Sequence, residues 1–271
     1  MLNDKRIRIV LSFLFFFILI AFFAPFLSPF DPFEQNLKEG LASPAAQHWL
    51  GQDKLGRDIL SRILYGARIS LWVGITTVSI SLSIGMVVGA TAGLFGGWTD
   101  DLLMRLVDIF LAFPGILLAI AFAAVLGPSL RNVILALSLM GWVGYARLIR
   151  GQILVAREEE YVTAARALGA GSIRLITRHL LPNILAPVIV EATFGMSGAI
   201  VTEASLSFLG LGVQPPTPSW GAMLSDGRSF LLLAPHLTTF PGLAILFVVM
   251  TLNLLGDRLR DRLDVKSHID K

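Results

Sequence analysis

Six long apolar runs constrain the fold more than any other feature of this 271-residue sequence. A helix needs about 20 consecutive apolar residues to cross a hydrocarbon core about 30 Å thick. The composition agrees, because 55% of the residues are hydrophobic and only 15% are charged. We therefore expect an all-α integral membrane protein with six transmembrane helices, over residues 9–27, 69–95, 102–126, 133–149, 184–212 and 237–255.

The first run follows Lys5, Arg6 and Arg8, as in a secretory signal. It is longer than the roughly 7 to 15 apolar residues of a signal, so we expect a retained anchor helix. Residues 28–68 then form an extramembrane segment. Its last part, residues 58–69, has apolar residues at helical spacing and is expected to lie on the outer surface of the membrane.

Lys and Arg residues predict the orientation, because cytoplasmic segments carry an excess of them. With the N-terminus inside, fifteen of the 22 fall on the cytoplasmic side, and both termini are expected in the cytoplasm. The inner set is Lys5, Arg6, Arg8, Arg105, Arg147, Arg150, Arg157, Arg166, Arg174, Arg178, Arg258, Arg260, Arg262, Lys266 and Lys271, and the outer set is Lys38, Lys54, Arg57, Arg62, Arg68, Arg131 and Arg228.

The sequence offers no catalytic or metal site. There is no cysteine, and the four histidines are dispersed along the chain. The spacing from Gly51 to Gly56, Arg57 and Asp58 approaches a phosphate-binding loop, but it lacks the phosphate-binding Lys and the hydroxyl for Mg²⁺. We interpret it as a turn before a helix. Neither catalysis nor nucleic-acid binding is expected.

The cytoplasmic segment over residues 151–183 carries the most information. Tyr161, Ala164, Ala165 and Leu168 share one helical face, and Gly169 ends that helix. A second short helix is expected to end at Pro182. The periodicity leaves two interpretations open. The segment is either a docking knob for a cytoplasmic protein or an amphipathic loop that lies on the membrane surface.

Three separated motifs resemble one family. Residues 160–170, which include Glu160, Tyr161, Ala164, Ala165 and Gly169, followed by Leu181-Pro182-Asn183, resemble the E-A-A loop of ABC importer permeases. Thr163 and His179 depart from the family's Glu and Ile. Residues 50–58, and residues 203–212 together with 218–221, resemble the C-type permeases of its dipeptide, oligopeptide and nickel branch.

The resemblance implies a type I ABC importer permease fold over residues 68–257. Residues 1–67 would then form a tail, anchor helix and outer segment, and residues 258–271 a cytoplasmic tail. It implies a multi-pass subunit of a prokaryotic inner membrane that contacts lipid and pairs with a second, different permease. Two cytoplasmic ATPases would bind ATP and Mg²⁺ and contact the coupling loop, and an extracytoplasmic protein would deliver substrate. Leu168 would belong to that coupling loop. Di- and oligopeptides are the first choice of substrate, and nickel complexes the second.

Two acids lie within the fifth apolar run, where charge is expensive and suggests function. Glu203 is a candidate for the substrate path, the alternative being a structural hydrogen bond, and Glu191 is expected to pair with an Arg. Gly85, Gly89 and Gly93 are spaced for close helix packing. Pro114, Pro187 and Pro241 are expected to interrupt helical hydrogen bonding.

Two further functions remain open from the residues alone. A proton-driven secondary transporter could use Glu191 or Glu203 as its titrating group. Uptake by such a protein would survive loss of the ATPases and collapse with the proton gradient. A passive membrane scaffold would show no uptake defect when deleted.

Overall fold

The computed structural model describes the backbone of residues 5–269 and the side chains of residues 8–262. Within that range the chain is helical and contains no strand, so the expected all-α class is confirmed. The side chains of Lys5, Arg6 and Lys266, and all of Lys271, lie outside the described part. The helices are α1 (Lys5–Leu27), α2 (Ile59–Phe95), α3 (Gly97–Leu111), α4 (Gly115–Leu126), α5 (Leu130–Ala156), α6 (Glu160–Ala167), α7 (Ser172–Arg174), α8 (Leu181–Phe208), α9 (Trp220–Gly227) and α10 (His236–Ile269).

Five of these segments are long and apolar enough to cross a membrane: α1, α2, α5, the continuous stretch from α7 through α8, and α10. The pair α3 and α4, bent by 81°, passes the same test together and is either a sixth, broken span or a re-entrant loop. Pro114 precedes α4 at the bend. Proline has no amide hydrogen, and it disfavours helical geometry in the residue before it. Pro187 and Pro241, in contrast, lie inside the continuous helices α8 and α10.

The helix α2 begins ten residues before the predicted start at residue 69, because residues 59–69 form its first turns. They do not form a separate helix, because Asp58 caps a single helix of 37 residues by accepting a hydrogen bond from the Ser61 amide. Such a helix is about 55 Å long, so its ends project beyond a hydrocarbon core of about 30 Å. Ile59 and Ala67 are buried in its first turns, as their shared face predicted.

The ends of two other helices differ from the prediction. The second cytoplasmic helix does not stop at Pro182, because a π-helical segment, Leu175–Leu180, joins α7 to α8 without a break. π-helical turns are rare and occur mostly as single turns within longer helices. The expected tail after residue 257 is the continuation of α10, which runs on to Ile269.

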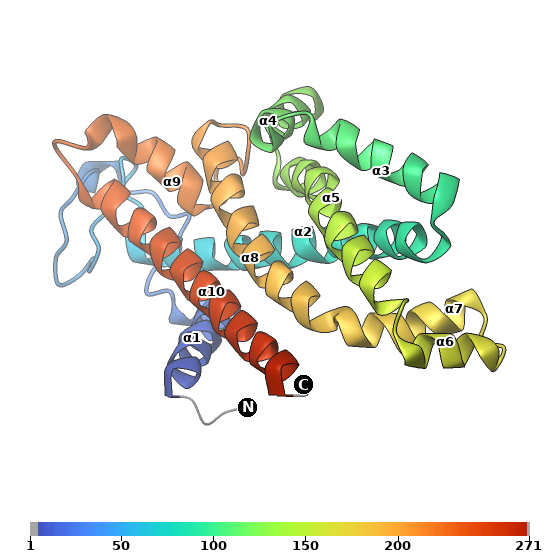
Figure 1. Cartoon of the computed structure of the whole chain (residues 1–271). Helices are drawn as coiled ribbons and strands as arrows, with labels where there is room; N and C mark the ends of the chain where they lie inside the picture. Colours follow the sequence, from blue (N-terminus) through green and yellow to red (C-terminus); the bar gives the residue numbers. More distant parts are fainter. Residues whose placement is uncertain (1–4, 270–271) are drawn as a thin grey trace.

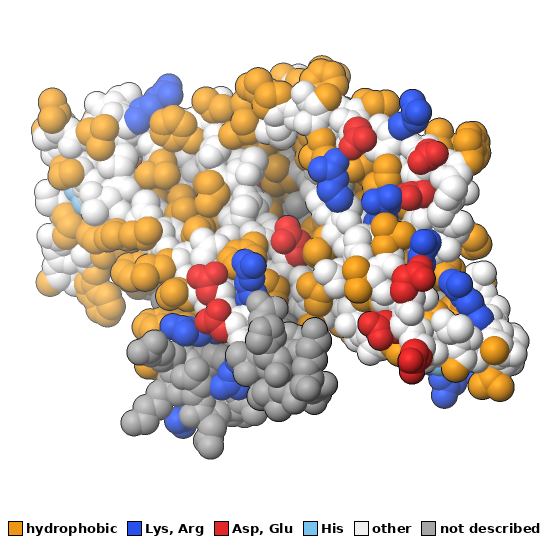
Figure 2. Space-filling view, viewed as in Figure 1, with side chains coloured by type: hydrophobic (Ala, Val, Ile, Leu, Met, Phe, Trp, Pro, Cys, Tyr) orange, Lys and Arg blue, Asp and Glu red, His pale blue; other side chains and the backbone are white. Residues whose placement is uncertain are grey.

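The helices pack around α2, α5 and α8, which cross one another in the middle of the molecule (Figure 1). The short helices α6 and α7 form one end, and α9 lies at the other end beside the loop that joins α1 to α2. Figure 2 shows charged side chains at the α3, α5 and α6 end and a second group toward the lower part of α10, whereas hydrophobic side chains cover much of the rest of this face.

Candidate functional site

The α6–α7 knob (residues 160–174) extends from the end of α5. Val162 and Ala165 of α6 are buried and pack with Leu175 and Leu180 in one apolar cluster. The opposite side of α6 exposes Tyr161 and Ala164. Ala165 therefore lies inward, although its spacing assigned it to the outer face. The reason is that Val162 and Ala165, three residues apart, form the stripe that packs against the bundle.

A left-handed glycine ends α6. Gly169 has φ +82°, and its amide donates to the Arg166 carbonyl at 2.9 Å, while the Ala170 amide donates to the Ala165 carbonyl at 3.0 Å. This is the Schellman arrangement, in which glycine avoids the steric cost of a positive φ. Leu168, just before the glycine, is 89% exposed. The turn therefore holds a large apolar side chain in a fixed, outward position.

The start of α8 braces the knob. Asn183 Nδ2 donates to the Tyr161 hydroxyl at 2.9 Å and to the His179 carbonyl at 2.8 Å. Leu181 packs against the apolar cluster below α6, and Pro182 is exposed beside it. The residues predicted around 160–169 and 181–182 are thus brought together. Glu160 is exposed in the first turn of α6, at the edge of this surface.

Two ion pairs join α5 to α3, and the sequence did not predict either of them. Arg150 forms a bidentate pair with Asp100, with Nε–Oδ1 and Nη2–Oδ2 distances of 2.5 and 2.6 Å. Arg147 pairs with Asp108 at 2.7 Å. These contacts explain why α5 continues past residue 149 to Ala156 with two arginines in its second half. They also engage both arginines with α3 rather than with Glu191.

Three glycines bring α2 into backbone contact with α5. A Cβ atom added at Gly85 would lie 2.5 Å from Tyr145 Cβ, and one at Gly89 would lie 2.5 Å from the Ala146 carbonyl oxygen. At Gly93 it would lie 2.9 Å from Ile153 Cγ2. Small residues at this spacing allow helices to approach closely in a membrane. The stripe therefore sets the distance between α2 and α5.

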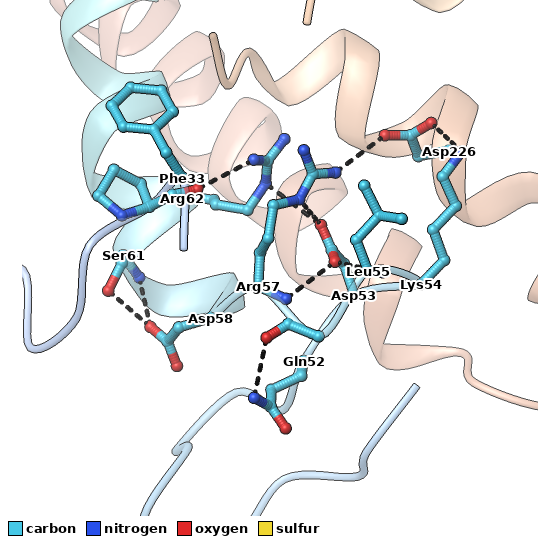
Figure 3. A network of polar contacts seen from close by, with 12 residues as sticks. Phe33, Gln52, Asp53, Lys54, Leu55, Arg57, Asp58, Ser61, Arg62 and Asp226 are labelled. Atoms are coloured by element: carbon cyan, nitrogen blue, oxygen red, sulfur yellow. Dashed lines mark hydrogen bonds and ion pairs between the residues drawn. The ribbon is translucent and has the colours of Figure 1, made fainter. Parts of the chain in front are cut away.

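A buried ionic network lies at the opposite end, near α9 (Figure 3). Asp53 Oδ2 lies 2.6 Å from Arg57 Nε and 3.5 Å from Arg62 Nε, and all three side chains are buried. Asp226 of α9 lies 2.6 Å from Lys54 Nζ and 3.6 Å from Arg57 Nη2. The network ties the loop before α2 to α9.

This loop is also the sequence that approaches a phosphate-binding motif. Gly56 has φ +71°, and a Cβ atom there would lie 1.9 Å from the Asn36 carbonyl oxygen, so only glycine fits. Gln52 Nε2 donates to the Gly56 carbonyl at 3.0 Å. Arg57 is committed to two aspartates, so the segment is a tight structural turn.

Glu203 is fully buried, with 0% exposure, near the end of α8. Its Oε1 accepts a hydrogen bond from Ser207 Oγ at 2.7 Å, and Ser207 Oγ in turn accepts one from the Val213 amide at 3.0 Å. Its Oε2 has no hydrogen-bond partner among the described residues. This arrangement links the end of α8 to the segment that leads into α9.

Glu191 lies elsewhere, on the wall of a cavity of about 350 Å³ between α2, α4, α5 and α8. It forms no ion pair with a described residue, so the expected pairing with an Arg is absent. Thr77, Ser81, Tyr145 and Thr202 also line this cavity. These residues come from three helices, and their spacing along the chain gives no sign that they meet.

Comparison with protein families gives two matches. Residues 85–267 match the binding-protein-dependent transport system inner membrane component, and residues 4–44 match the N-terminal transmembrane domain of oligopeptide transport permease C. The first match contains every residue of the knob and of the glycine stripe.

Curated relatives and a solved structure agree with these matches. The dipeptide transport system permease protein DppC of Alkalihalophilus pseudofirmus is 50% identical, over 92% of this chain and 82% of its own length. The glutathione transport system permease protein GsiD of Pectobacterium atrosepticum is 47% identical, over 94% and 85%. An inward-facing structure of the MetNI methionine ABC transporter covers 75% of this chain and 97% of its own, with 20% identity and a TM-score of 0.56.

The last likeness establishes the fold, and the sequence relatives establish the family. Members are multi-pass inner-membrane subunits that work with ATPase and substrate-binding partners. The predicted type I permease fold is confirmed, as is the predicted branch of the family. The chain therefore belongs to the binding-protein-dependent transport system inner membrane components, the permease subunits of ABC importers.

Proposed function

We propose that this permease subunit forms a path for the uptake of di- and oligopeptides. The observation that carries the substrate class is the extent of the likeness to a dipeptide permease, at 50% identity over 92% of this chain. The oligopeptide permease match at residues 4–44 adds a second, independent segment. Together they favour peptides over nickel complexes, the other substrate expected in this branch.

The α6–α7 knob is the proposed coupling surface for a cytoplasmic ATPase. Its exposed side chains Tyr161, Ala164 and Leu168 present small and large apolar groups on a short helix. The Schellman turn and the Asn183 brace hold these groups in a defined geometry. Exposed apolar side chains on a rigid support are typical of a docking surface rather than of a solvated loop.

The remaining assembly follows from this assignment. A second, different permease completes the path, and one ATPase binds below each permease. The ATPases hold ATP and Mg²⁺, so this chain itself needs no cofactor and is not catalytic. An extracytoplasmic binding protein delivers peptide at the α9 end, and both termini of this chain lie in the cytoplasm.

A coupled-transport assay tests the proposal. The complete complex is reconstituted in liposomes with loaded binding protein and ATP, and peptide uptake and ATP hydrolysis are both measured. Ala164→Arg should lower both by at least about tenfold, because it buries an unpaired charge in the contact. The matched control is Thr163→Arg, which is also exposed but lies about 100° further around α6. Equal activity of the two variants would show that the Ala164 face of α6 is not the surface that contacts the ATPase.

The same assay separates the other transport mechanism. Uptake through an ABC importer requires ATP and continues when a protonophore dissipates the proton gradient. Uptake by a proton-coupled carrier stops under the protonophore and needs no ATPase subunit. Addition of nickel complexes in place of peptide tests the second substrate class directly.

Glu203 remains a proposed contributor to the substrate path. Glu203→Gln preserves the shape of the side chain and its hydrogen bond with Ser207 while removing the charge. A path role predicts a change in the apparent affinity for peptide in an assembled complex. A structural role predicts unchanged uptake kinetics.

A further inference from the structure

The cavity that contains Glu191 lies at the middle of the membrane-spanning helices. Thr77 is central in α2, which extends from Ile59 to Phe95. Glu191 is central in the span Ser172–Phe208. The cavity volume of about 350 Å³ is within the range of small-ligand sites. Its location near the middle of the membrane is where transporters commonly bind their substrates.

The walls of the cavity carry polar groups that no described residue satisfies. The Tyr145 hydroxyl and Thr77 Oγ1 have no hydrogen-bond partner within the described part of the chain, although both residues are only 5% exposed. Buried polar atoms are normally hydrogen-bonded, so each unpaired group calls for a partner. Both side chains line the cavity, but neighbouring atoms close off the two oxygens, so each can pair with a group inside the cavity only when the wall adjusts.

Two glycines shape the space beside these groups. A Cβ atom at Gly195 would lie 2.3 Å from the Tyr145 hydroxyl oxygen, so glycine is required for the hydroxyl to occupy its position. A Cβ atom at Gly198 would have nothing within 4 Å, because that part of the wall faces open space. The cavity is therefore kept open by missing side chains rather than left by loose packing.

The charge of the lining selects the ligand. Glu191 is exposed into the cavity, and the lining contains no Lys, Arg or His. The neighbouring Arg147 and Arg150 are paired with Asp108 and Asp100. A carboxylate at this depth is costly without a counter-ion, and an ammonium group supplies both the opposite charge and strong hydrogen bonds.

We propose that this cavity is a binding station on the translocation path, in which Glu191 is the counter-ion for the N-terminal ammonium group of a peptide. The charged contact comes from Glu191, which is exposed, and the closed-off Tyr145 and Thr77 hydroxyls border it. The inference rests on the proposed peptide-import function. Glu203, which is sealed from this cavity, takes no part in it.

The first test measures how many peptides enter per ATP hydrolysed in the reconstituted complex. Glu191→Gln should reduce this ratio about tenfold while ATP hydrolysis stimulated by loaded binding protein stays normal. Glu191→Asp should restore most of the ratio, because it keeps the charge. The control is Glu34→Gln, an exposed carboxylate in the loop after α1, which should leave the ratio unchanged.

The second test uses the absence of cysteine in this chain. Gly198→Cys in the complete complex should react with a water-soluble, positively charged thiol reagent, and transported peptide should slow the reaction at least fivefold. Leu246→Cys, exposed on α10 outside the cavity, should show no protection by peptide. Labelling is scored on this chain alone, after separation by mass.

Each outcome decides the inference. A normal peptide-to-ATP ratio in Glu191→Gln, or Gly198→Cys that peptide does not protect, would overturn it. Failure of Glu191→Gln to assemble with the second permease would also overturn it, because the counter-ion would then be a partner cation at the subunit interface. Failure of the unmodified complex to import peptide with ATP would instead refute the proposed function.

Discussion

Neutralising Asp53 should destabilise the α9 end of the protein more than any other single charge removal in the network. Asp53 Oδ2 faces Arg57 at 2.6 Å and Arg62 at 3.5 Å, while Oδ1 accepts hydrogen bonds from the amides of Leu55 and Arg57 at 2.8 and 3.0 Å. Asparagine can keep the two backbone bonds. The substitution to asparagine leaves the buried guanidinium groups of Arg57 and Arg62 without the carboxylate that they share.

The structure sets the size of the effect. Breaking a buried ion pair from one side costs about 3 to 5 kcal/mol. Arg57 keeps Asp226 at 3.6 Å and Arg62 keeps the Pro32 carbonyl at 3.2 Å, so we expect the lower end, about 3 kcal/mol. Asp226→Asn is the matched control. That carboxylate is 33% exposed, and its removal should cost less than about 1 kcal/mol.

The assay is the free energy of unfolding in mixed detergent micelles for the parent, the single variants Asp53→Asn, Asp226→Asn and Arg57→Met, and the double variant Asp53→Asn with Arg57→Met. The double variant removes one of the stranded charges, so it should be more stable than the sum of the two single changes predicts. A loss below about 0.5 kcal/mol for Asp53→Asn, or a loss equal to that of Asp226→Asn, would refute the reasoning.

Three further predictions concern packing and the loop. Gly89→Val should lower the free energy of unfolding by about 1 to 3 kcal/mol, because its Cβ would lie 2.5 Å from the Ala146 carbonyl oxygen, whereas Gly144→Val, with open space around its Cβ, should cost under about 1 kcal/mol. Equal losses would show that α2 and α5 are not in tight contact. Gly56→Ala should abolish stable assembly of the loop, detected as rapid proteolysis between α1 and α2, and a protease-resistant variant would contradict the close approach to Asn36. Ser207→Ala should lower the melting temperature without changing peptide affinity, because it removes the buried hydrogen bond to Glu203, and an altered affinity would support the path role.

The membrane spans were predictable because hydrophobic length is a local property of the sequence. Helix ends were less predictable wherever charges found partners far along the chain. Apolar spacing predicted a separate surface segment over residues 58–69, but in the structure they begin α2, and Arg62 bonds to the Pro32 carbonyl and lies beside Asp53. Arg150 similarly marked an early end for α5, and its pairing with Asp100 of α3 allows the helix to continue.

The knob was largely predictable because α6 is short, amphipathic and ended by glycine. Periodicity grouped Ala164 with Ala165, yet only packing decides which of two adjacent small residues turns inward. The cavity around Glu191 was not predictable. Its walls come from α2, α4, α5 and α8, and an unpaired hydroxyl such as that of Tyr145 is visible only once the helices are assembled.

Crosslinking from the knob tests the central claim most directly. Ala164→Cys, in a chain with no other cysteine, can carry a photoactivatable group in transport-competent membranes. The account predicts capture of an ATP-hydrolysing subunit, with a yield that changes when ATP is bound. Capture of lipid alone, or of no ATPase at all, in membranes that still import substrate would contradict it.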